Sequence, residues 1–237
     1  MAEVEILINA MYTQVGLYRG RPILSLRWPQ TPLPESDVYD IYGRRVFNLG
    51  TCNSVLIRSD RIVLVDPGII QLGRYGALQA RLKELGPSPE EIDAVVNTHC
   101  HYDHVESNYL FRGKPLYIHQ REMEHAKQLY WPEYARAFME ILQIQEVKDG
   151  LEIAKGVKVI ETFGHTLGSI SVIAETESGL VVIAGDSINV KRDFLERREP
   201  QVIVANADPE EARRSIERIA DLRPALIIPG HDAPFNP

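Results

Sequence analysis

The chain has 237 residues, of which 44% are hydrophobic and 25% charged, with a formal net charge of −7 at pH 7 and a pI near 5.5. This length and composition suit one soluble globular domain over 1–237 and exclude a disordered or fibrous chain. The negative charge disfavours nucleic acid as a partner, because polyanions are repelled on average.

The sequence predicts a protein of the cytoplasm. No stretch approaches the roughly 20 continuous apolar residues that a membrane-spanning helix needs, so we expect no membrane contact. The first residues, MAEVEILINAMYTQ, carry glutamates where a secretory signal has a basic region and an apolar run. Cys52 and Cys100 are too few for a disulfide framework and form no CxxC pair, so both are expected to be reduced.

The first part of the chain is expected to form an irregular arm followed by a strand meander. Residues 1–45 contain several prolines and little periodicity. Short segments rich in branched residues, separated by Gly, Asn, Ser and Asp, then predict strands at 46–49, 54–58 and 61–66. Apolar residues at helical spacing predict a helix over 74–85.

The rest of the chain alternates strands and helices, and no repeat or linker divides it. Apolar segments predict strands at 93–99, 115–119, 156–162, 169–176, 179–186 and 224–229, with helical stretches from about 120 to 143. A further helix is expected after Asp208, which is followed by proline at the first helical position and glutamate at the third, a capping pattern.

The segment NTHCHYDH, 97–104, concentrates histidines and an aspartate at the end of one predicted strand. Three more candidates stand at similar junctions: His165 in GHTLGS, Asp186 in AGDS and His231 in PGHD. Loops held by a rigid sheet commonly bring functional side chains together from distant parts of a chain. We therefore expect these residues to converge on one site.

The spacing within 97–104 favours metal binding. In an extended segment, residues two apart point the same way, so His99 and His101 can bind one ion while Cys100 faces the interior. Asp103 and His104 are adjacent and diverge unless the backbone turns sharply, which favours a second ion. Imidazole and carboxylate donors suit zinc, iron or manganese.

Five segments, VDPG, THCHYDH, GHTLGS, AGDS and PGHD, occur in this order over roughly 46–231, and the chain thereby resembles the metallo-β-lactamase superfamily of metallohydrolases. The resemblance implies an α+β fold, a four-layer αββα sandwich with the site at one rim of two facing sheets. It implies a first metal held by His99, His101 and His165, and a second held by Asp103, His104 and His231. Asp186 would bridge the two, and Asp66 of VDPG would support the site without binding metal.

Two divalent ions, with zinc the first choice and iron or manganese the alternatives, would make the protein a dinuclear metal-dependent hydrolase. A hydroxide that bridges the ions would attack a small ester, thioester or lactone, as in lactonase-like and glyoxalase II-like members. Asp103 is the candidate catalytic residue, accepting a proton and returning it to the leaving group.

Two other activities stay open. A phosphodiesterase or nuclease would use the same ions to hold the attacking and leaving oxygens. A sulfur dioxygenase would use one iron ion, and a metal stoichiometry near one would favour it. Against nucleic acid, the segments that carry the candidate ligands contain no lysine or arginine.

Candidate substrate contacts are hydroxyl, amide and aromatic side chains near the ligands, which suit a small molecule in a partly apolar pocket. The helical insertion at 120–145 is rich in aromatic residues and is expected near the cleft, where it lines the substrate pocket, forms a homodimer interface or simply packs as core. The candidates are Tyr102, Asn108, Ser169, Tyr130 and Trp131, with Tyr134 as a further member of the insertion.

Overall fold

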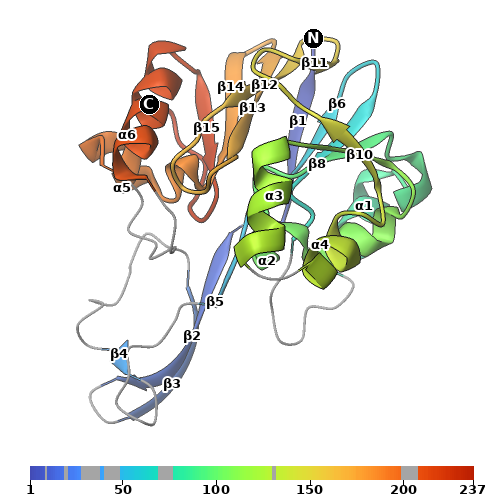
Figure 1. Ribbon diagram of the computed structural model, residues 1–237. Coiled ribbons are helices and arrows are strands. Elements are labelled where there is room, and N and C mark those ends of the chain that lie inside the picture. The colour runs from blue at the N-terminus through green and yellow to red at the C-terminus, as the bar shows by residue number, and fades with distance from the viewer. Residues whose placement is uncertain are drawn as a thin grey trace.

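The computed structural model describes residues 1–8, 10–18, 21–27, 38–39, 49–68, 77–129, 132–198 and 208–237. Two mixed β-sheets face each other, and helices cover their outer sides (Figure 1). The first sheet has the strand order β1 (Glu3–Ile8), β6 (Ser54–Arg58), β7 (Ile62–Val65), β8 (Ala94–Val96), β9 (Pro115–Ile118) and β10 (Gln143–Glu146). The second has the order β11 (Glu152–Ala154), β12 (Val157–Glu161), β13 (Ile170–Thr176), β14 (Gly179–Gly185) and β15 (Leu226–Pro229).

Alternating side chains divide the core into layers. In β6, Val55 and Ile57 lie in the core between the sheets, whereas Leu56 faces the helices outside the first sheet. In β14, Ile183 faces inward and Val182 faces the helices outside the second sheet. This period of two is that of strands buried on both faces, and each such side chain contributes about 1.5–3 kcal/mol. The predicted αββα sandwich is therefore confirmed.

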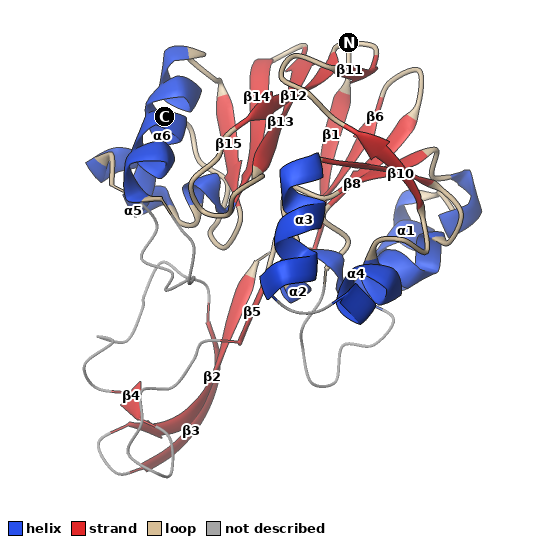
Figure 2. Ribbon diagram, in the orientation of Figure 1, coloured by secondary structure: helices blue, strands red, loops and turns tan. Residues whose placement is uncertain are grey.

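The covering helices pack through one apolar face each (Figure 2). Helices α1 (Ala77–Leu85), α3 (Gln120–Leu129) and α4 (Pro132–Phe138) cover the first sheet, and α5 (Lys191–Glu196) and α6 (Pro209–Asp221) cover the second. At the start of α6, Oδ1 of Asp208 accepts hydrogen bonds from the backbone N–H groups of Glu210 and Glu211 at 2.9 and 3.0 Å, as its capping pattern predicts.

The region 1–45 differs from the irregular arm that we expected. Strand β1 pairs antiparallel with β6 and buries Leu7 and Ile8. Strands β2 (Met11–Tyr18), β3 (Arg21–Arg27), β4 (Val38–Tyr39) and β5 (Leu49–Thr51) form a third sheet, which projects away from the sandwich (Figure 1). Of the strand predicted at 46–49, the first three residues lie outside the described part of the chain.

Strand β10 replaces the end of the predicted helical stretch. It pairs in parallel with β9 at the edge of the first sheet, and all four of its side chains are exposed. Backbone pairing therefore holds it in place without an apolar pattern in the sequence.

Cys52 and Cys100 are buried free thiols. Among the described residues, no helix combines the length and apolar character that crossing a membrane requires.

Candidate metal centre

The carboxyl ends of five strands deliver the candidate ligands and the supporting residue Asp66. β7 and β8 run parallel in the first sheet, and β14 and β15 run parallel in the second, so their carboxyl ends meet at one edge of each sheet. Asp66 follows β7, Asp186 follows β14 and His231 lies two residues after β15, while the segment after β8 carries His99 and the loop after β12 carries His165.

The motif at 97–104 is only partly extended, which corrects the extended loop that we expected. Helix α2 (Tyr102–Val105) begins within it, with His101 at the N-cap. Successive residues of a helix point about 100° apart, so Asp103 and His104 diverge while both stay near the same edge of the sheet. The start of this short helix supplies the sharp backbone turn that keeps the adjacent residues Asp103 and His104 at one site.

The first donor group consists of His99, His101, His165 and Asp186, whose candidate donor atoms all lie within 4.8 Å of one another. Nδ1 of His101 is 2.9 Å from Nε2 of His99 and 3.1 Å from Nε2 of His165. Oδ2 of Asp186 lies 3.3 Å from Nε2 of His165. All are buried except His101, which is partly buried.

The second donor group consists of Asp103, His104 and His231. Oδ2 of Asp103 lies 3.1 Å from Nε2 of His231 and 3.8 Å from Nε2 of His104. Oδ1 of Asp186 is 3.2 Å from Nε2 of His104 and 3.4 Å from Nε2 of His231. The two oxygens of Asp186 thus face different groups, the arrangement that a bridging carboxylate requires.

The two groups fit metal ions. A tetrahedral zinc with Zn–N distances of about 2.0–2.1 Å holds its donor atoms about 3.3 Å apart, and the 2.9–3.3 Å separations in the first group are close to that value. Nε2 of His104 and Oδ1 of Asp186 are buried, and neither forms a hydrogen bond of good geometry within the described residues, although the two atoms lie 3.2 Å apart. Buried polar atoms seldom stay without a partner, so a cation between them would satisfy both.

Thr98 fixes which nitrogen of His99 faces the group. Oγ1 of Thr98 donates its hydrogen to Oδ2 of Asp66 at 2.7 Å. Its 3.1 Å contact with Nδ1 of His99 therefore requires that Nδ1 carry the proton and donate. The lone pair of Nε2 is then directed into the first donor group, as metal binding demands.

The pKa values of the histidines differ between the two donor groups before any metal is bound. Burial lowers the pKa of His99 well below its usual value, that of His101 below its usual value and that of His165 to about 3. These imidazoles are neutral at pH 7 and have lone pairs available for a cation. The first donor group can therefore bind a metal ion without releasing protons.

The histidines of the second group behave oppositely. Burial alone would lower the pKa of His231, but Asp186 and Asp103 raise it to about 10. Cys52 and the nearby carboxylates likewise raise the pKa of His104 well above its usual value despite burial. Burial would raise the pKa of Asp103, but His104 and His231 outweigh it and lower the pKa to about 2. A metal ion that binds the second donor group must therefore displace protons from His104 and His231.

Asp66 lies behind the second group, as expected for a supporting residue. Its Oδ2 accepts from Nδ1 of His104 at 2.9 Å, and its Oδ1 accepts from the backbone N–H of Thr98 at 2.7 Å. Gly68 in the same VDPG segment lies against α2, where an added Cβ would come within 1.7 Å of the backbone oxygen of Asp103. Only glycine allows this approach.

The predicted substrate contacts divide into three classes. Tyr102 is 38% exposed and stacks edge-on against Phe138 at the rim. Asn108 is fully buried and donates to Oδ1 of Asn97 and to the Phe138 carbonyl, and Ser169 is buried and donates to the Thr162 carbonyl. The polar groups of these two residues are hydrogen-bonded inside the protein, so the geometry does not favour them as substrate contacts, and both assignments stay predictions. Tyr130 and Trp131 lie outside the described residues.

Two residues of the insertion contact the ligand-bearing loops in ways that the sequence did not predict. The buried hydroxyl of Tyr134 donates to the Cys100 carbonyl at 2.8 Å, so this side chain anchors the motif and does not line a pocket. Glu122, in a stretch whose composition is typical of a charged surface, is buried against two ligand-bearing loops. Its place on the buried face of α3, beside Met123 and Ala126, was the available signal.

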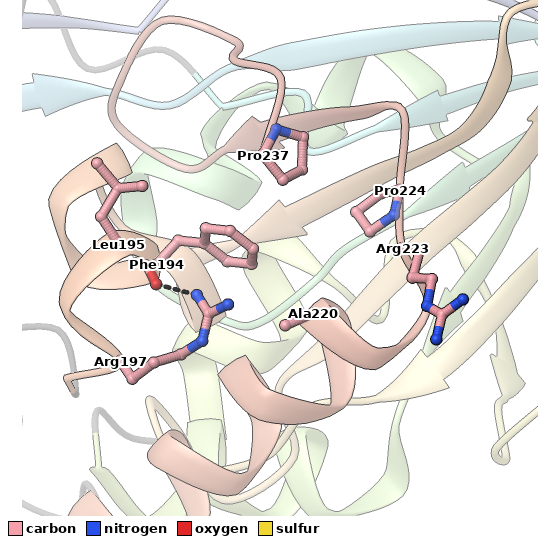
Figure 3. A pocket seen from close by; sticks show the side chains of 7 residues that line it. All are labelled: Phe194, Leu195, Arg197, Ala220, Arg223, Pro224 and Pro237. Atoms are coloured by element: carbon pink, nitrogen blue, oxygen red, sulfur yellow. Dashed lines mark hydrogen bonds between the residues drawn. The ribbon is translucent and has the colours of Figure 1, made fainter.

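A surface hollow of about 420 Å³ lies apart from the two groups, between α5, α6 and the C-terminal residue (Figure 3). It is lined by Phe194, Leu195, Arg197, Ala220, Arg223, Pro224 and Pro237, none of which is a candidate ligand. The structure therefore gives no reason to place the candidate site there.

The pattern that defines the metallo-beta-lactamase superfamily matches residues 47–231. The chain belongs to the metallo-beta-lactamase superfamily. This match contains all seven candidate ligands and Asp66. The predictions of the superfamily and of its fold are confirmed, whereas the individual ligand assignments stay predictions that the geometry favours.

Relatives within the superfamily are named for hydrolysis. A protein of Methanocaldococcus jannaschii named "probable metallo-hydrolase" is 34% identical over 152 residues, 64% of this chain and 62% of that protein, less than two thirds of its length. An N-acyl homoserine lactonase of Bacillus cereus is 32% identical over 208 residues, 85% of this chain and 74% of that protein. These names confirm the prediction of an enzyme at the level of its class, the metal-dependent hydrolases of this superfamily.

A solved structure shows the shared fold over nearly the whole chain. A variant of AiiA from Bacillus thuringiensis, with N-decanoyl-L-homoserine at its active site, superposes with a TM-score of 0.69. The superposition covers 98% of this chain and 92% of that chain at 23% identity. At 23% identity, the superposition shows a shared arrangement of strands and helices, that is, a shared fold.

Proposed function

We propose that this superfamily member is a dinuclear hydrolase that opens a small lactone, with small esters and thioesters as the wider substrate class. The observation that carries the proposal is the pair of donor groups joined through Asp186, whose oxygens lie 3.3 Å from His165 and 3.2 Å from His104. The lactonase of Bacillus cereus, similar over 85% of this chain, favours the lactone within that class.

Divalent ions held by the two groups, with zinc the first choice, would supply a water-derived nucleophile at neutral pH and polarise the substrate carbonyl. The chain's own residues hold the geometry for this chemistry. Thr98 fixes the tautomer of His99, and Asp66 orients His104 through Nδ1. Burial of the donors excludes bulk water from all but the substrate side.

Asp103 is proposed to move the proton. Its side chain is 21% exposed, against 0% for its neighbour His104, so it lies on the open side of the second group. Its lowered pKa keeps the carboxylate ionised at pH 7. An oxygen of Asp103 would accept the proton of the attacking water and return it to the oxygen that leaves when the ester bond breaks.

The surroundings of the groups favour a neutral or weakly charged substrate over a polyanion. The segments 97–109, 162–170, 185–190 and 229–235 contain no lysine or arginine, whereas phosphate contacts from basic side chains supply most of the affinity for nucleic acid. The test is kcat/KM for N-acyl homoserine lactones, aryl esters and thioesters against bis-aryl phosphodiesters, on one zinc-loaded preparation. Preference for the lactones is expected, and preference for the phosphodiesters would overturn the proposal.

A further inference from the structure

Helix α3 places a carboxyl group inside the protein next to the first donor group. Glu122 lies in the first turn of α3, and its side chain is fully buried. Burial of a carboxyl group is unfavourable unless hydrogen bonds satisfy its oxygens. The groups that donate to Glu122 therefore show what this side chain holds in place.

Three donors meet the carboxyl group. Oε1 of Glu122 accepts from the backbone N–H of Cys100 at 2.8 Å. Oε2 accepts from the hydroxyl of Thr166 at 2.7 Å and from the backbone N–H of Gly168 at 3.0 Å. Both oxygens are engaged, and none of these bonds involves another residue of α3.

The donors come from the two loops that carry the histidines of the first group. Cys100 stands between His99 and His101, and Thr166 follows His165 directly. Glu122 is thus the side chain that hydrogen-bonds both loops, and it does so one residue away from each of the three imidazoles. A shift of either loop would change the separations of 2.9 and 3.1 Å between their nitrogens.

Close packing at the same point supports this role. A Cβ added to Gly168 would lie 2.4 Å from the backbone nitrogen of Glu122 and 2.9 Å from its Cβ, so the loop approaches α3 as closely as only glycine allows. On the other side of the Cys100 peptide, the carbonyl accepts from Tyr134 of α4. The insertion therefore fixes both polar groups of the residue between His99 and His101.

We propose that Glu122 is a positioning residue for the first donor group, whose carboxyl group joins the two histidine loops and sets the spacing of the three imidazoles. The inference rests on the proposed function only in that the first donor group binds a metal ion. It assigns the insertion at 120–145 a role in assembling the metal centre, beyond that of a wall of the cleft.

The test isolates the first group by working in a His231→Ala background, where the second group has lost a donor. Glu122→Gln keeps the shape of the side chain but presents an amide N–H₂ to groups that themselves donate. The matched control is Glu124→Gln, an exposed position on the same helix that accepts a surface hydrogen bond from Gln120. The measurements are Zn²⁺ affinity by chelator competition and the visible spectrum of bound Co²⁺.

Glu122→Gln is expected to weaken Zn²⁺ binding by about 10-fold or more, the usual effect of losing a group that orients metal ligands, and to change the Co²⁺ spectrum. Glu124→Gln should leave both unchanged. A folded Glu122→Gln protein with the affinity and spectrum of its parent would overturn the inference, since a purely structural role would lower thermal stability alone. A His231→Ala parent that binds no ion would overturn it as well.

A second pair of variants decides the matter if Glu122→Gln does not fold. Thr166→Val removes one donor to Glu122 with little change in volume, and Thr166→Ser restores it. Weaker Zn²⁺ binding in the valine variant with recovery in the serine variant is expected, and equal affinity in the two would contradict the inference. Because metal affinity is read here, a protein that binds two ions but hydrolyses no ester would overturn only the proposed function.

Discussion

Oδ2 of Asp66 lies 2.9 Å from Nδ1 of His104, and both side chains are shielded from solvent. The carboxylate also accepts from the Thr98 hydroxyl, which in turn contacts His99. One aspartate therefore orients an imidazole of each donor group, directly in the second and through Thr98 in the first. A hydrogen-bonded carboxylate behind a ligating histidine fixes its ring and raises its basicity.

Asp66→Asn should weaken metal binding at the second group about 10- to 100-fold. Both carboxylate oxygens of Asp66 accept hydrogen bonds from Thr98 and His104, whereas an amide has one oxygen that accepts and an N–H₂ group that can only donate. Isothermal titration with Zn²⁺ measures this. Asp221→Asn, at the end of α6 and away from both donor groups, is the matched control and should change nothing. Unaltered affinity in Asp66→Asn would show that Asp66 does not support the site.

Asp103→Asn should reduce turnover by at least about 100-fold, the lower range for the loss of a positioned acid–base group. The amide cannot accept the proton that the carboxylate is proposed to move. Metal content has to be determined on the same sample, because Asp103 is also a candidate ligand. A folded, metal-replete variant with nearly normal turnover would exclude the proton-transfer role.

The two groups should differ in the protons released on metal binding. His104 has a raised pKa and His231 has a pKa of about 10 in the metal-free protein, so at pH 7 both are protonated and must each lose a proton to bind an ion. The lowered pKa values of His99, His101 and His165 mean that the first group releases almost none.

Calorimetry in buffers of different ionisation enthalpy separates these events. We expect about two protons for the second ion and close to none for the first at pH 7. Affinity for the second ion should accordingly rise as the pH is raised from about 6 to about 9, while affinity for the first stays nearly constant. Equal proton release by both ions would contradict the assigned electrostatics.

Asp193 should make stability depend on pH away from the metal centre. Burial raises its pKa to about 6, although the Val190 N–H and Arg198 oppose the shift. The folded state thus holds this proton to higher pH than the unfolded state, so the stabilisation is complete below the usual value of 3.8 and is lost as the pH rises through about 6.

Asp193→Asn removes this titration while keeping an acceptor for Val190. The free energy of unfolding of the wild type, relative to the variant, should fall by up to about 3 kcal/mol between about pH 4 and pH 7. Urea denaturation of the metal-free proteins at several pH values measures the difference. A difference that does not vary with pH would show that Asp193 titrates normally.

Most of the sandwich could be predicted because its inner strands are apolar on both faces. VVIAG in β14 and AVV in β8 are short apolar runs typical of buried strands, and the candidate ligands follow such strands closely. Strand β10 could not be predicted, because QIQE is exposed at a sheet edge and is held by backbone bonds to β9. Strand β1 was missed because its glutamates interrupt the pattern of apolar residues that indicates a strand. Its pairing with β6, which holds it in the sheet, cannot be seen in the sequence.

The candidate site divides in the same way. His99, His101 and the other donors could be predicted because histidines and aspartates at such short spacing are rare outside metal sites. The supporting contacts of Glu122 and Tyr134 could not, since they depend on how α3 and α4 dock against loops far away in sequence. The burial of Asn108 and Ser169, which we predicted to contact the substrate, could not be predicted either, because it depends on tertiary packing.

Metal titration of the apoprotein tests the central claim most directly. Chelator-treated protein would receive Zn²⁺ in steps, with hydrolysis of an N-acyl homoserine lactone measured at each step. The paired donor groups, joined by Asp186, lead us to expect no activity without metal and a maximum near two ions per chain. Full activity in the metal-free protein, or a maximum at one ion with no further rise, would contradict a dinuclear hydrolase.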